Sequence, residues 1–248
     1  MLGYAQQTLM RSREALALAQ RSAYPADIAF AMFFAAVLYQ CRREAPQVRE
    51  QAEEVIRLAT EQGFTHWVAG GTLLRGWALV HQGALEEGIE QLRQGHNAWL
   101  ATGNELGKTQ ILARLSEAYG KAGYPEEGLR VLDEAFATLQ KNAERHYESD
   151  LYRLKGVLLL QQTGLQLPPM SVWREAETCF QQAVDVARQQ GAKFLELRAV
   201  MRLGSLWQTH DRREQAYQAL KKAYDWFAEG LDTPDLQEAK KLLETLQV

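Results

Sequence analysis

The stretch that decides the fold is GWALVHQGALEEGIEQLRQG, residues 76–95. Gly76 lies inside one apolar segment, and Gly88 and Gly95 lie at a seven-residue spacing inside the next. Gly83 stands between the two segments with polar neighbours, where a tight turn is expected. Two antiparallel helices pack closely only where the crossing residues are small. The stretch therefore predicts two helices joined by a short turn.

The same spacing recurs along the whole chain, which indicates an internal repeat. Small residues at the position of Gly76 follow one another in steps of 40, 40, 40 and 48 residues: Ala36, Gly76, Ser116, Gly156 and Gly204. Residues at the position of Gly95 follow in steps of 40, 40, 40, 48 and 40: Ala15, Val55, Gly95, Ala135, Ala183 and Ala223. Because one hairpin cannot bury both of its faces, successive hairpins are expected to stack.

These columns resemble those of the tetratricopeptide repeat, whose period is about 34 residues. The period here is longer, so we expect longer helices and links. The resemblance implies an all-α, right-handed superhelix of antiparallel hairpins with a period of about 40 residues. The scarcity of Val, Ile and Thr in alternating patterns argues against sheets.

The columns predict one repeat domain over residues 1–248. It begins with half a hairpin over 1–23, a lone second helix that lacks its first helix. Thr233-Pro234-Asp235 reads as a helix start, and it predicts a capping helix over 234–246. The hairpins between them are expected at 25–63, 64–103, 105–143, 146–191 and 193–230.

Composition excludes several classes of protein. The 248 residues are 46% hydrophobic and 24% charged, with a net charge of −3. A disordered chain and a general nucleic-acid binder are therefore disfavoured. The longest apolar run, 28–39, is too short to span a bilayer, and no secretory signal opens the sequence. Two distant cysteines, Cys41 and Cys179, read as reduced thiols. We expect a cytoplasmic protein that binds neither membranes nor nucleic acid.

No catalytic or metal-ligating pattern stands out. GNELGKT, residues 103–109, has three residues between its glycines, where a phosphate-binding loop has four. The five histidines form no pair at metal-ligand spacing. We therefore expect no enzyme activity, no metal and no cofactor.

Ordered short segments resemble the C-terminal tetratricopeptide tail of bacterial signalling proteins that carry a class III adenylate/guanylate cyclase domain and a signal-transduction ATPase domain. The segments are REALALA (13–19), RGWAL (75–79), EAYGKAG (117–123), LYRLKG (151–156), ARQQGAKFLELRA (187–199) and FAEGLDTPDLQEAKKLLE (227–244). The resemblance implies a sensor or regulatory module. It carries over no catalytic residue, because no cyclase or ATPase segment is present.

A superhelix of hairpins forms a concave groove lined by its first helices, where a protein or peptide is expected to bind. By the repeat alignment, the groove residues that we expect to contact a partner are Phe33, Trp77, Arg114, Glu117, Arg153, Arg198 and Arg202. The apolar part suits an apolar anchor, and the arginines suit acidic side chains. The alternative is that these arginines are solvated, or that they pair with Glu117, Asp150 and Glu196 within the array.

Two other functions stay open. The unpaired first helix exposes Leu9 and Leu16, which makes a homodimer through this helix an alternative. A small-molecule or nucleotide-sensing groove is the third hypothesis.

Overall fold

The computed structural model describes residues 2–142, 144–165 and 168–247, and these residues form α-helices, one short 3-10 helix and connecting turns. The chain divides into two compact units, one of residues 5–122 and one of the described residues of 1–4 and 123–248. The predicted all-α fold of tetratricopeptide-like hairpins is confirmed in both. The right hand of the superhelix and the single domain over 1–248 stay predictions.

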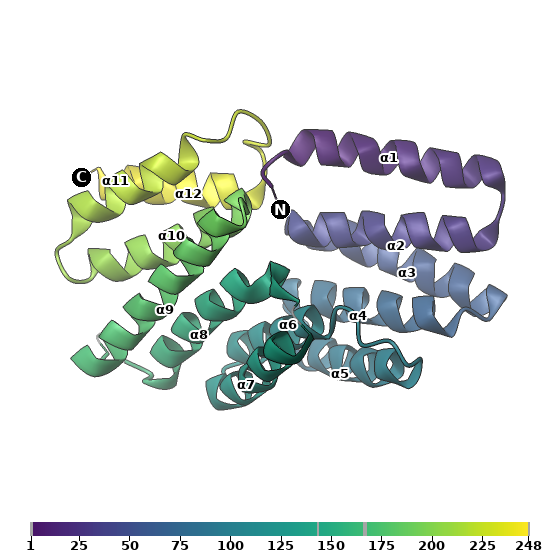
Figure 1. Cartoon of the computed structure of the whole chain (residues 1–248), viewed down its shortest axis with the longest axis horizontal. Coiled ribbons are helices and arrows are strands. Elements are labelled where there is room, and N and C mark those ends of the chain that lie inside the picture. Colours follow the sequence, from purple (N-terminus) through teal and green to yellow (C-terminus); the bar gives the residue numbers. More distant parts are fainter. Residues whose placement is uncertain (1, 143, 166–167, 248) are drawn as a thin grey trace. The chain divides into compact units, whose positions relative to one another are not determined.

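The unit of residues 5–122 contains six helices in succession (Figure 1). Consecutive helices pack against each other, and the first helix of each expected hairpin also packs against the next first helix, so that α4 contacts both α2 and α6. The bounds are α1 Ala5–Ser22, α2 Pro25–Cys41, α3 Ala45–Gln62, α4 Thr65–His81, α5 Leu85–Ala101 and α6 Lys108–Lys121.

The other unit repeats this pattern and ends with one further helix. α8 packs against α9, α9 against α10 and α10 against α11, and α12 packs against both α10 and α11. The bounds are α7 Pro125–Asn142, the 3-10 helix Arg145–Tyr147, α8 Glu148–Gln162, α9 Met170–Gln189, α10 Lys193–Gln208, α11 Arg213–Tyr224 and α12 Pro234–Leu246. One step of the repeat is 48 residues long, eight more than the others, and its extra residues lie between α8 and α9. Gln166 and Leu167 of this connection fall outside the described residues.

The crossing between α4 and α5, which the sequence predicted, depends on glycine residues. A Cβ atom added at Gly76 would lie 2.8 Å from the backbone nitrogen of Leu92 and 2.9 Å from the carbonyl oxygen of Gly88. A Cβ atom added at Gly88 would lie 2.7 Å from the backbone nitrogen of Val80. The two backbones therefore touch directly, and no larger residue fits without moving one helix.

Gly204 has the same repeat position as Gly76 but less crowded surroundings, because a Cβ atom added at Gly204 meets nothing closer than 3.7 Å. We expect Gly76→Ala to lower the free energy of unfolding by about 1–3 kcal/mol through overpacking. Gly204→Ala is expected to raise it by up to about 1 kcal/mol, since alanine favours the helix. Urea unfolding of the wild type and both variants, followed by circular dichroism, measures both changes. A Gly76→Ala variant as stable as the wild type would contradict the close crossing.

Candidate functional site

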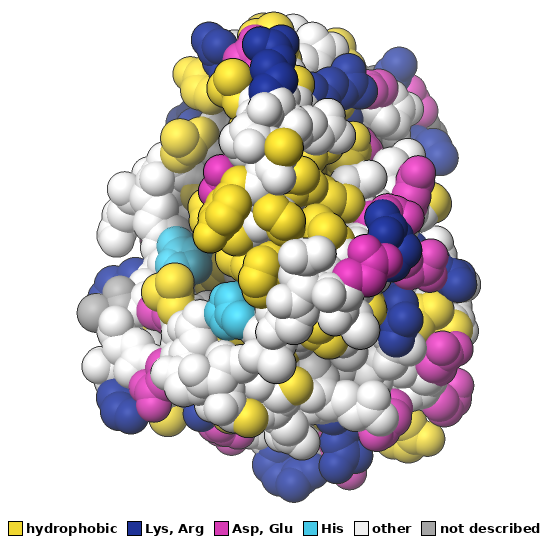
Figure 2. Space-filling view, turned by 90° about the vertical axis from the view of Figure 1, so that its right-hand side faces the viewer, with side chains coloured by type: hydrophobic (Ala, Val, Ile, Leu, Met, Phe, Trp, Pro, Cys, Tyr) yellow, Lys and Arg dark blue, Asp and Glu magenta, His cyan; other side chains and the backbone are white. Residues whose placement is uncertain are grey.

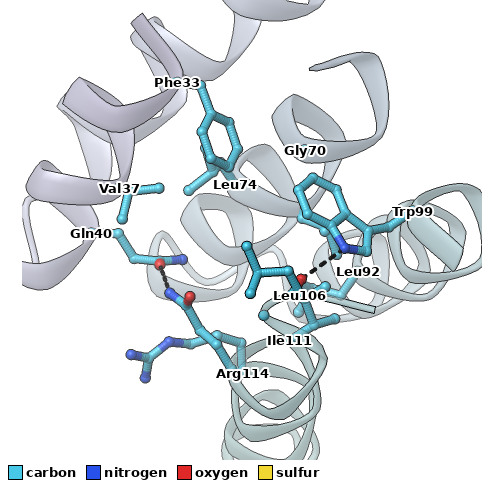
Figure 3. A pocket seen from close by; sticks show the side chains of 13 residues that line it. Phe33, Val37, Gln40, Gly70, Leu74, Leu92, Trp99, Leu106, Ile111 and Arg114 are labelled. Atoms are coloured by element: carbon cyan, nitrogen blue, oxygen red, sulfur yellow. Dashed lines mark hydrogen bonds between the residues drawn. The ribbon is translucent and has the colours of Figure 1, made fainter. Parts of the chain in front are cut away.

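The main candidate site is a pocket in the unit of residues 5–122, on the face formed by α2, α4 and α6. We call it the α2–α4–α6 pocket (Figure 3). Its cavity is about 70 Å³ and lies between the first helices, the end of α5 and the α5–α6 connection. The lining residues are Phe33, Val37, Gln40, Gly70, Leu73, Leu74, Leu92, Trp99, Leu106, Gly107, Gln110, Ile111 and Arg114.

Aromatic and aliphatic side chains build one side of this pocket. The Phe33 ring stacks on Trp99 with centroids 6.3 Å apart and planes inclined by 20°. Trp99 Nε1 donates a 3.0 Å hydrogen bond to the carbonyl oxygen of Leu106, which fixes the α5–α6 connection beside the pocket. Leu106 itself is 72% exposed, so its side chain stands open to a partner. An exposed apolar side chain next to a cavity is typical of a binding surface.

Polar side chains build the opposite side. Gln110 Nε2 donates a 3.2 Å hydrogen bond to Gln40 Oε1, which joins α6 to α2 across the pocket (Figure 3). Arg114 is buried and donates to Glu117 one helical turn later, at 3.4 Å. The pocket therefore offers an apolar wall and, facing it, amide groups and a guanidinium group.

A chain of aromatic rings, which we call the aromatic cluster, extends from this pocket across the middle of α2 to the N-terminal end of α4. Phe33 contacts Trp67 at 5.2 Å and Phe34 at 5.3 Å between centroids, and Phe30 contacts Phe34 at 4.6 Å. Phe30 and Phe34 are about half exposed. Figure 2 shows hydrophobic side chains gathered into one patch, next to histidine side chains, on the side where the α1–α2 connection lies.

The predicted groove residues that belong to the unit of residues 5–122 lie in different surroundings. Phe33 and Arg114 both line the α2–α4–α6 pocket. Trp77 is only 3% exposed, and its ring packs on His81 with centroids 4.0 Å apart. Glu117 accepts from Arg114 and lies 4.0 Å from His81 Nε2. Phe33 is half-buried beside the pocket and Trp77 lies in the interior, and the contact of either residue with a partner stays a prediction.

Two of the three predicted arginines of the other unit, Arg153 and Arg198, have acidic partners. Arg153 is buried and donates to Asp150 at 2.8 Å. Arg198 makes a forked pair with the buried carboxylate of Asp235, at 2.7 to 3.1 Å, and this pair attaches α12 to α10. These pairs favour the alternative in which the arginines bind acids of the array, although Asp235 is not among the acids that the sequence analysis named.

The remaining predicted residues lie on exposed or half-buried surface. Arg202 is exposed on α10, and recognition of an acidic partner by Arg153, Arg198 and Arg202 stays a prediction. Leu9 and Leu16 are half-buried on α1, the helix that packs on α2, and their part in self-association is likewise untested.

Chemistry that would suggest a reaction is sparse. In the part of the chain that the structure describes, no three His, Cys, Asp or Glu side chains are grouped closely enough to hold a metal ion. The GNELGKT segment follows helix α5, whereas a phosphate-binding loop follows a strand. Neither Cys41 nor Cys179 is in a disulfide bond, and burial raises the pKa of Cys179. Within the described residues, none of the helices is both long and apolar enough to cross a membrane.

His81 is a buried histidine of α4 whose pKa is strongly lowered. Burial lowers its pKa from 6.5 to about 4, with Glu117 opposing the shift and nearby cations adding to it. Its Nε2 atom and Trp77 Nε1 have no hydrogen-bond partner among the described residues. Burial without such partners favours the neutral imidazole.

This shift predicts a loss of stability on mild acidification. The unfolded chain binds a proton at His81 with a pKa near 6.5, and the folded chain binds it only near 4. The contribution of His81 to the free energy of unfolding is therefore complete above pH 6.5 and falls toward pH 4, by at most about 1.4 kcal/mol per pH unit. His81→Phe keeps a ring against Trp77 and removes the proton site. Urea unfolding between pH 7 and pH 5 should show a flatter pH dependence for this variant; identical pH dependence would contradict burial of the neutral ring.

Comparison with known proteins supports the fold. No protein-family profile and no curated protein matches the chain. Among solved structures, the chain is similar to the crystal structure of BtubC (BKLC) from P. vanneervenii, with a TM-score of 0.59, 14% identity, and 89% of each chain covered. It also aligns with the TPR2AB domain–pHSP90 complex of yeast Sti1, covering 98% of this chain and 100% of that one at 13% identity, with a TM-score of 0.40. The first match shows a shared fold.

Proposed function

We propose that this chain is a non-catalytic scaffold that binds a segment of another protein, and that the α2–α4–α6 pocket receives an apolar side chain of that segment. The observation that carries the proposal is the pocket itself, with Leu106 exposed at an apolar wall of Phe33 and Trp99. Pockets that accept one large apolar anchor are the usual energetic centres of protein interfaces.

The size of the cavity favours a protein segment over a small ligand. Pockets that enclose drug-sized ligands and cofactors measure about 300–1,000 Å³. The α2–α4–α6 pocket measures about 70 Å³, which is room for part of one side chain. The small-molecule and nucleotide hypothesis is therefore the weaker one for this site.

The polar side of the pocket suits the main chain of a bound segment. Gln40 and Gln110 bring side-chain amides to the pocket, and an amide both donates and accepts hydrogen bonds. Arg114 lies next to them and adds a positive charge, part of which Glu117 offsets. We infer that the partner segment carries a large apolar residue that contacts the pocket. An acidic residue near it is the second feature that we expect, because Arg114 is positively charged.

A peptide library displayed on phage tests this proposal. We expect selection on the wild-type chain to enrich peptides with a shared large apolar residue. Leu106→Glu should weaken their binding at least tenfold, because a carboxylate would stand at the apolar wall. Leu165→Glu is the matched control, since Leu165 is 60% exposed in the other unit, and it should leave binding unchanged. Peptides that bind the wild type and Leu106→Glu equally would contradict the assignment of the pocket.

The finer assignment is that the chain regulates a bacterial cyclase–ATPase signalling protein. Its support is the ordered resemblance of the six segments from REALALA to FAEGLDTPDLQEAKKLLE. We expect this chain, added in trans to a protein of that family that lacks its own tail, to change its rate of cyclic nucleotide formation. Leu106→Glu should abolish the change. An unchanged rate with the wild-type chain would count against the regulatory assignment and leave the peptide site untouched.

A further inference from the structure

A second surface, separate from the α2–α4–α6 pocket, runs between α1 and α2. We call it the α1–α2 groove; its volume is about 580 Å³. Leu18 of α1 and Phe30 and Phe34 of α2 line it, and they are 62%, 53% and 49% exposed. Large apolar side chains gathered in one groove normally mark a surface that another helix covers.

The α1 side of the groove is shaped for close helix packing. The residues of α1 that line it include Ser12, Ala15, Ala19 and Ser22, which recur every three or four residues and so share one side of the helix. Small side chains let a second helix approach to a short interaxial distance. The aromatic rings of α2 stand beside this row and supply the apolar area.

We propose that the occupant of the α1–α2 groove is the same groove of a second copy of this chain, so that two α1–α2 hairpins form an antiparallel four-helix bundle. A pair of helices with one apolar face is half of such a bundle, and a two-fold axis completes it. In this arrangement Leu18, Phe30 and Phe34 of each copy are covered by the small residues and rings of the other.

The charges at the two ends of the groove select the second copy as the partner. Asp27 lies at the connection between the helices, where Ser22 Oγ is 3.2 Å from its carboxylate. Arg11 lies eleven residues before Ser22, about 16 Å away along α1. The groove is thus negative at one end and positive at the other. A two-fold axis across its middle places Arg11 of each copy next to Asp27 of the other copy, which gives two opposite-charge contacts.

Arg11 and Asp27 remain able to contact a second copy, because their contacts within the chain are weak. Arg11 pairs with Glu14 at 2.8 Å, but both side chains are at least half exposed, and such surface pairs contribute little. The second copy therefore gains two charge contacts without breaking a buried pair.

Sedimentation equilibrium of the whole chain over a range of concentrations tests pairing. We expect a reversible dimer for the wild type. Phe34→Glu should weaken it at least a hundredfold, because it places two carboxylates in the apolar centre. Arg13→Glu on the same helix, outside the groove lining, should leave the dimer unchanged, and so should Leu106→Glu. Circular dichroism verifies that each variant keeps its helices.

Charge reversal tests the two-fold arrangement. Arg11→Glu alone and Asp27→Lys alone should each weaken the dimer about tenfold, or about 1.4 kcal/mol, since like charges then meet twice. A mixture of the two variants should form a heterodimer of wild-type affinity, because both contacts again join opposite charges.

Three results would overturn the proposal: a wild-type chain that stays monomeric, a Phe34→Glu variant that dimerises like the wild type, or a mixture that associates no more tightly than the single variants. Binding of a helical peptide from another protein in the groove of a monomeric chain would identify a different occupant and likewise overturn it. None of these results bears on the proposed binding of a peptide in the α2–α4–α6 pocket, which Leu106→Glu tests separately.

Discussion

The structure depends on how closely the two helices of a hairpin approach each other. At the α4–α5 crossing, Gly76 and Gly88 bring backbone against backbone, so the helices are held by contacts that no side chain interrupts. Such contacts fix the angle and the register of the hairpin, because sliding either helix by one residue would force a Cβ atom into the opposing backbone. In the unit of residues 5–122, α4 then packs between α2 and α6, which makes one continuous face of first helices.

The candidate site follows from that face. The stacked rings of Phe33 and Trp99 join α2 to the end of α5, and the Gln40–Gln110 hydrogen bond joins α2 to α6. The side chains around the pocket are thus held by three separate helices. A partner would meet a preformed surface, which lowers the entropy lost on binding. The same preformed packing buries His81, and this burial lowers the pKa of its imidazole.

Sequence reasoning predicted the helical hairpins because the crossing residues repeat at a fixed spacing, and a repeat is visible without tertiary information. It did not predict the Arg198–Asp235 pair, since the two residues are 37 positions apart and meet only when α12 docks on α10. Alignment placed Trp77 at a groove position, but contact with His81 covers its ring. The α1–α2 groove could be anticipated only as an unpaired helix; its aromatic side, Phe30 and Phe34, belongs to α2 and became visible in the structure.

The function that we propose depends on the binding of a protein segment to the face of first helices in residues 5–122. Methyl NMR spectra of the chain with a selected peptide test it most directly, because Val37, Leu74, Leu106 and Ile111 report on the pocket from four different elements. We expect these methyl signals to shift together as the peptide is added, while the methyl signals of α9 and α11 stay in place. Shifts confined to α9 and α11, with the pocket signals unchanged, would contradict it.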